Sequence, residues 1–133
     1  MTLQHDNIEN LPGRTGEPTS FTGQTRVQFL ASGQQESVGV ARVTFERGAR
    51  TFWHVHSGEQ VLYFLEGRGR VQVRGEEPVD ASEGDVVRIP AGVEHWHGAH
   101  PEEEHRMRHL AITFGSVTWL DPVSDEDYQG GSR

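Results

Sequence analysis

Residues 48–67 read Gly-Ala-Arg-Thr-Phe-Trp-His-Val-His-Ser-Gly-Glu-Gln-Val-Leu-Tyr-Phe-Leu-Glu-Gly, and this stretch organises the chain. Its histidines, His54 and His56, are two residues apart, and side chains at that spacing on a β-strand point to one face. The tripeptide at 57–59, Ser-Gly-Glu, predicts a tight turn that returns Gln60 toward the histidines on the next strand. Neutral imidazole is the commonest protein metal ligand. Two histidines beside an oxygen donor therefore predict a divalent-metal site.

A second constellation occupies residues 84–95, which read Gly-Asp-Val-Val-Arg-Ile-Pro-Ala-Gly-Val-Glu-His. It consists of a glycine, a short apolar strand, a Pro-x-Gly turn and a histidine. The chain has eight histidines, and all but His5 lie between His54 and His109. This clustering near the two motifs favours a functional role for several of them. His100 and His105 fall in a charged segment with three consecutive glutamates, where we expect solvated side chains.

Composition limits the class of protein. With 133 residues, one domain is expected, and the absence of cysteine excludes disulfides and thiolate metal sites. The formal net charge of −8 disfavours nucleic acid and anionic membranes as partners. No apolar run has the length of a secretory signal or of a membrane span, which predicts a cytoplasmic protein.

Short apolar strands recur along the chain with turns between them, and no helical period of useful length is present. Strands are predicted at 26–31, 38–45, 51–56, 60–66, 70–74, 85–89, 94–98, 107–114 and 117–120. This spacing is typical of an all-β sandwich or barrel. We expect a flexible N-terminal arm at 1–20, a barrel at 21–123 and an acidic C-terminal tail at 124–133, which frays or forms one helical turn.

The two constellations together resemble the motifs of the cupin superfamily. The matching residues are Gly48, His54, His56 and Gly67 in the first motif, and Gly84, Pro90, Gly92 and His95 in the second. The resemblance implies an antiparallel jelly-roll barrel (a double-stranded β-helix) whose open mouth holds one divalent metal, and a homodimer.

The implied metal ligands are His54, His56, Gln60 and His95. Gln60 stands where the family usually has glutamate. Glu59 could serve if the register slipped by one residue, but such a slip would turn the side chain to the other face. Four neutral ligands leave the ion its full charge and make it a stronger Lewis acid. The donor set suits manganese, iron, cobalt, nickel or zinc, and the resemblance favours manganese.

The glutamine-bearing motif is similar to that of a small bacterial cupin group that includes manganese-dependent hydroxynitrile lyases. The shared segments are Val43–Thr51, Trp53–His56, His95–Ala99, His109–Ile112 and Val123–Tyr128. The resemblance implies that His109 acts as a general base beside the metal. His97 shares a face with His95, and we expect it to be a second catalytic residue in the pocket. The expected pocket residues are Ala41, Val43, Phe52, Phe64 and Thr113.

These observations predict a lyase acting on a small organic molecule, in which the metal stabilises negative charge and a histidine moves a proton. Two alternatives stay open at this point. One is a cupin dioxygenase, since three histidines with open metal positions could serve oxygen activation. The other is a non-catalytic binder of a small ligand.

Overall fold

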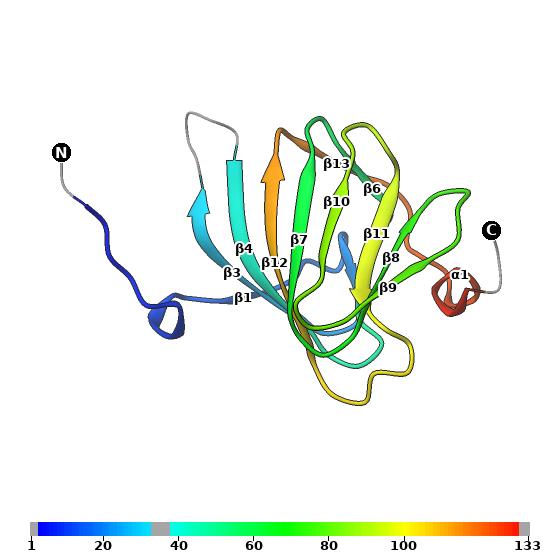
Figure 1. Ribbon diagram of the computed structural model, residues 1–133, viewed down its shortest axis with the longest axis horizontal. Helices are drawn as coiled ribbons and strands as arrows, with labels where there is room; N and C mark the ends of the chain where they lie inside the picture. Colours follow the sequence, from blue (N-terminus) through cyan, green and yellow to red (C-terminus); the bar gives the residue numbers. More distant parts are fainter. Residues whose placement is uncertain (1–2, 33–37, 131–133) are drawn as a thin grey trace.

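Two antiparallel sheets pack against each other in the computed structural model, which describes residues 3–32 and 38–130. The first sheet has six strands, in the order β1-β3-β4-β12-β7-β10 (Figure 1). Their bounds are β1 Arg14–Thr15, β3 Thr25–Ser32, β4 Val38–Phe45, β12 Met107–Phe114, β7 Gln60–Glu66 and β10 Val86–Ile89. The expected all-β jelly roll is confirmed.

The second sheet has the order β13-β6-β11-β5-β2, and the hairpin β8–β9 joins it through β11. Its strands are β2 Phe21–Thr22, β5 Arg50–Thr51, β6 His54–His56, β8 Gly69–Val73, β9 Val79–Ala81, β11 His95–Ala99 and β13 Val117–Trp119. Strand β11 lies at its centre, because it pairs with β5, β6 and β8. All five of its residues are buried.

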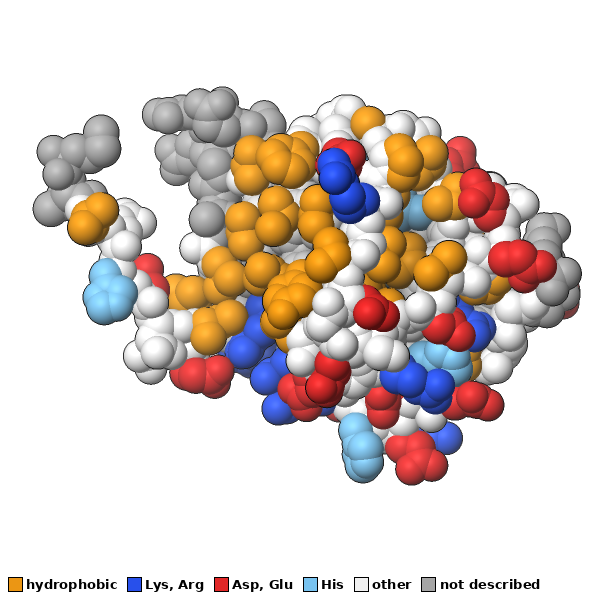
Figure 2. Space-filling view, viewed as in Figure 1, with side chains coloured by type: hydrophobic (Ala, Val, Ile, Leu, Met, Phe, Trp, Pro, Cys, Tyr) orange, Lys and Arg blue, Asp and Glu red, His pale blue; other side chains and the backbone are white. Residues whose placement is uncertain are grey.

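Alternation along the long strands builds the core between the sheets. On β4, Ala41, Val43 and Phe45 are buried, and they pair across to buried positions on β12. On β7, Leu62 and Phe64 are buried, while Tyr63 and Leu65 are exposed on the outer face. The space-filling view shows hydrophobic side chains gathered on the visible face, with most of the charged side chains below and to the right of them (Figure 2).

One expected strand is broken. Residues 51–56 were predicted as continuous, but β5 ends at Thr51 and β6 begins at His54. The chain bends at Trp53, and the preceding Phe52 amide donates to the Ser20 carbonyl at 2.8 Å. Trp53 then turns to the outside of the sheet, where it joins a second apolar cluster. In a continuous strand Thr51 and His54 would face opposite sides, but both line the cavity between the sheets, so simple alternation through this segment is wrong.

The terminal segments pack on the barrel within the described residues. In the predicted arm, a 3-10 turn η1 (Ile8–Asn10) is held by Gln28, and β1 pairs with β3. In the predicted tail, helix α1 (Asp125–Gln129) begins at the Ser124 N-cap and buries Tyr128. Residues 1–2 and 131–133 of these segments lie outside the described residues. Within the described ranges, no helix has the length and apolarity needed to cross a bilayer.

Candidate metal centre and its cavity

A cavity of about 410 Å³ lies between the two sheets. Residues at the start of β4 and β7 and near the end of β12 line part of it, among them Val38, Gln60 and Thr113. The full lining is Phe21, Phe29, Val38, Gly39, Ala41, Val43, Phe45, Thr51, His54, His56, Gln60, His97, Ala111, Thr113, Gly115, Val117 and Trp119. None of these described residues is lysine, arginine, aspartate or glutamate. The cavity therefore suits an uncharged, largely apolar molecule.

Histidines from β6 and β11 converge on the second sheet's inner face. His54 and His95 are paired directly across the two strands, and their rings are 4.3 Å apart. The ring of His56 is 4.9 Å from that of His54 and 5.2 Å from that of His95. All three are buried. The structure thus brings the three expected histidine ligands together, although His95 is distant in sequence.

Hydrogen bonds to the backbone set the tautomers of two of these rings. His54 donates from Nδ1 to the Phe52 carbonyl at 2.8 Å, and His95 donates from Nδ1 to the Val93 carbonyl at 3.0 Å. Each neutral ring then has its lone pair on Nε2. The side-chain oxygen of Gln60 lies 3.3 Å from Nε2 of His95. These two atoms are both acceptors, so they converge without a hydrogen between them, and a cation is what such an arrangement can bind.

Burial keeps the cluster uncharged at neutral pH. It lowers the pKa of His54 well below its usual value, and the neighbouring His95 lowers it further. Burial, again with His95, lowers the pKa of His56 to about 4, and burial also lowers the pKa of His95. Metal ions bind the neutral imidazole. Since Nδ1 of buried His56 has no hydrogen-bond partner, the residues present fit a divalent metal.

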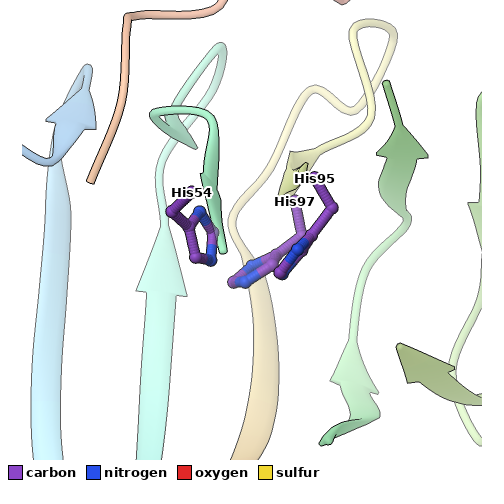
Figure 3. A group of neighbouring side chains, drawn as sticks. All are labelled: His54, His95 and His97. Carbon is purple, nitrogen blue, oxygen red and sulfur yellow. The ribbon is translucent and has the colours of Figure 1, made fainter. Parts of the chain in front are cut away.

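His97 joins this cluster from the same strand as His95. Ligand nitrogens of His54, His95 and His97 all lie within 4.8 Å of one another, and Figure 3 shows the three rings pointing toward a common space. Nδ1 of His97 is 3.0 Å from Nε2 of His109, while Nε2 of His97 is buried without a partner. His97 lines the cavity, so its free nitrogen can serve as a metal ligand or as a base.

His109 lies behind His97. It is fully buried, with its ring 5.0 Å from Phe45 and 5.6 Å from Phe64, and burial lowers its pKa to about 4. It is not among the described residues that line the cavity. His109, which was expected beside the metal, is therefore separated from the cavity by His97, the residue it contacts through Nε2.

The expected pocket residues divide into two groups. Ala41, Val43 and Thr113 line the cavity, but Phe52 and Phe64 do not. Phe52 lies in the break between β5 and β6, so the alternation of a continuous strand does not apply to it. Phe64 points between the sheets, yet it lies deeper, against His109. Alternation predicts which face a side chain occupies, but it does not predict depth along the sandwich.

Several lining residues were not predicted from the sequence. Phe21, Phe29 and Trp119 form an aromatic wall, and the Trp119 ring lies 4.6 Å from that of His54. Phe29 could have been found, because it alternates with Val27, which packs on the core. Trp119 could not, since it reaches His54 only through the pairing of β13 with β6.

The expectation of a solvated His100 is wrong. Its side chain is buried, with Nε2 at 3.2 Å from a carboxylate oxygen of Asp80. Arg70 also contacts this group, at 3.3 Å from the same nitrogen. These contacts place the ring beside Arg70 and Asp80, which pair across β8 and β9, and His100 is not among the described residues that line the cavity. His105 is exposed, as expected.

Comparison with known proteins gives a consistent result. The cupin domain family matches residues 41–113. The chain is 40% identical over 114 residues to an (R)-mandelonitrile lyase of Granulicella tundricola, covering 82% of this chain and 86% of that protein. It is 35% identical over 77 residues to an acireductone dioxygenase of Gluconobacter oxydans, covering 56% of this chain and 40% of that protein. The crystal structure of a cupin-like protein from Thermotoga maritima superposes with a TM-score of 0.85 at 38% identity, covering 96% and 98% of the two chains.

Proposed function

This chain belongs to the cupin family, and on that basis we propose that it is a metal-dependent lyase that cleaves a small, neutral cyanohydrin into a carbonyl compound and cyanide. One observation carries the proposal. The lone pairs of His95 Nε2 and Gln60 Oε1 converge near Nε2 of His97, which has no hydrogen-bond partner and lines a cavity without charged walls. The similarity to an (R)-mandelonitrile lyase over most of both chains supports the reaction type.

In this proposal His54, His56, Gln60 and His95 hold one divalent ion. Manganese is the first metal to test, with iron, cobalt, nickel and zinc as alternatives, since imidazole and amide oxygen suit all of them. When bound, the ion supplies a Lewis acid that stabilises negative charge on a substrate oxygen. The tautomers of His54 and His95 support this ligand set, because both leave Nε2 free.

We assign proton transfer to the pair His97 and His109. For Nε2 of His97 to accept the substrate's hydroxyl proton, Nδ1 must carry a hydrogen, which then donates to Nε2 of His109 at 3.0 Å. That bond orients the His97 ring and stabilises it once it is charged. As the bond between the carbinol carbon and the nitrile breaks, the electron pair leaves with cyanide. Cyanide then takes the proton from His97, and the carbonyl product remains.

The aromatic wall supports an aryl substrate. Phe21, Phe29 and Trp119 face the cavity, and rings of this kind pack favourably on one another. The cavity volume lies within the range of small-molecule sites.

The test is release of benzaldehyde from mandelonitrile by manganese-loaded protein. We expect metal-dependent release, which chelation abolishes. His97→Ala and His109→Ala should each lower kcat by about 100-fold or more, as for loss of a general base or its partner. His97→Ala should still bind manganese in calorimetry, which separates proton transfer from ligation. His105→Ala alters an exposed histidine and serves as the control.

Two results would contradict this function. The first is no benzaldehyde from any metal-loaded form, and the second is an unchanged rate in both histidine variants. Thermal stabilisation by a small ligand without turnover would then favour a binding protein.

A dioxygenase is the second candidate, and the similarity to an acireductone dioxygenase favours it. Oxygen uptake by the iron-loaded protein with a diketone or acireductone substrate, without cyanohydrin cleavage, would establish it. We also propose a homodimer, which the exposed apolar side chains of Tyr63, Leu65 and Val86 on the outer sheet face support.

A further inference from the structure

We propose that Thr113 is a positioning residue that holds the Gln60 carboxamide with its oxygen directed to the metal. The inference rests on the metal site proposed above. It gives Thr113 a role distinct from that of a pocket wall, because it acts through Gln60.

The two residues face each other across neighbouring strands. Thr113 on β12 is the direct partner of Gln60 on β7. Side chains opposite each other in an antiparallel pair are near enough to interact. The Gln60 amide nitrogen donates to the Thr113 hydroxyl oxygen at 2.8 Å. The amide oxygen is then directed to the other side, 3.3 Å from Nε2 of His95.

A glutamine ligand has a requirement that a glutamate ligand does not. Only its oxygen can coordinate a metal, so the nitrogen must face away and needs an acceptor of its own. Gln60 is buried, and leaving the nitrogen unpaired there would disfavour the coordinating orientation. The lone pair of the Thr113 hydroxyl meets this requirement.

Threonine is well suited to this position on a strand. It is β-branched, so few side-chain rotamers are available and the hydroxyl is held in place. Its side chain is partly buried at the cavity wall, and no charged residue among the described lining residues competes for the amide. A partner of this kind behind a metal ligand is typically worth a factor of about 10–100 in metal affinity.

The experiment compares Thr113→Val, which keeps the shape and removes the hydroxyl, with Thr113→Ser, which keeps the hydroxyl. Manganese and cobalt affinities are measured by calorimetry, and the visible absorption of bound cobalt reports its ligands. We expect Thr113→Val to bind about 10-fold more weakly with an altered cobalt spectrum. Thr113→Ser should restore both to nearly wild-type values.

A double-mutant cycle shows whether the effect passes through Gln60. In the background of Gln60→Ala, Thr113→Val should change metal affinity no further. An equal loss in that background would overturn the inference, as would wild-type affinity and spectrum in Thr113→Val. Failure of the wild-type protein to bind any divalent ion would instead overturn the metal site itself, and this inference with it. Thermal melting of each variant confirms that the fold is intact.

Discussion

Buried histidines dominate the chemistry at the level of single residues. His54, His56, His95, His97 and His109 are all buried, and burial is the largest cause of the lowered pKa of each one. Neutral imidazole is the form that binds a metal or accepts a proton. The fold thus keeps these rings in the neutral, reactive form at neutral pH. In acid, the same burial lowers the free energy of unfolding, because the unfolded chain can bind protons that the folded chain does not.

The first prediction concerns the stability of the metal-free protein in acid. The pKa of His56 and of His109 falls from 6.5 in the unfolded chain to about 4 in the fold. Below pH 6.5 the unfolded chain binds protons that the folded chain does not, so the free energy of unfolding must decrease as the pH falls toward 4. Each such histidine contributes at most about 1.4 kcal/mol per pH unit in this window. Urea unfolding at several pH values checks this.

Two variants test whether a buried histidine causes the loss of stability in acid. His109→Phe keeps a ring among Phe45 and Phe64 and should flatten the acid dependence, since one titrating group is lost. His105→Gln alters an exposed side chain and should leave the steep dependence in place. Equal slopes in all three proteins would show that the buried rings do not govern acid stability.

Among the strands, β11 contributes buried side chains to both faces of the second sheet. His95, His97 and Ala99 face the interior, and Trp96 packs in the outer cluster. Between them, Gly98 pairs with Arg50 of β5. A Cβ atom on Gly98 would lie 2.5 Å from Cα of Arg50 and 2.6 Å from the Ala49 carbonyl oxygen. Only glycine allows the two strands to approach so closely.

We predict that Gly98→Ala destabilises the protein by about 1–3 kcal/mol, the usual range for overpacking. Gly39→Ala is the matched control, because Gly39 also lies in a strand and a Cβ there meets nothing within 4 Å. It should be neutral or slightly stabilising, since alanine restricts the unfolded chain. Thermal melting of both variants measures the difference, and equal melting temperatures would contradict the packing argument.

For the whole molecule, helix α1 joins the C-terminal segment to the back of the second sheet. Tyr128 packs against Trp96, with ring centroids 5.6 Å apart, and its hydroxyl donates to the Ala99 carbonyl. Arg50 lies over the Tyr128 ring at 4.3 Å and bonds to Asp125 at 2.9 Å. The strand that carries His95 and His97 is thus supported from behind by a segment more than twenty residues away.

Tyr128→Phe tests this support, because it removes the hydroxyl and keeps the ring. Loss of one buried hydrogen bond should cost about 1 kcal/mol, or roughly 4 °C in melting temperature. Thr118→Val removes the hydroxyl of an exposed residue on β13 and should have little effect. An unchanged melting temperature in Tyr128→Phe would show that the hydroxyl does not anchor the helix.

The sequence by itself determined the all-β architecture and the inward direction of Ala41, Val43 and Thr113, because a period of two is a local property of extended backbone. The two-residue spacing put His54 and His56 on one strand face, and the resemblance of the second motif to cupin sequences implied that His95 lies near them. Only the tertiary structure decided that Phe52 and Phe64 lie outside the cavity and that His109 lies behind His97. The physical reason is that depth along the sandwich, the break between Thr51 and His54 and the partner of Gln60 depend on pairings between strands far apart in sequence.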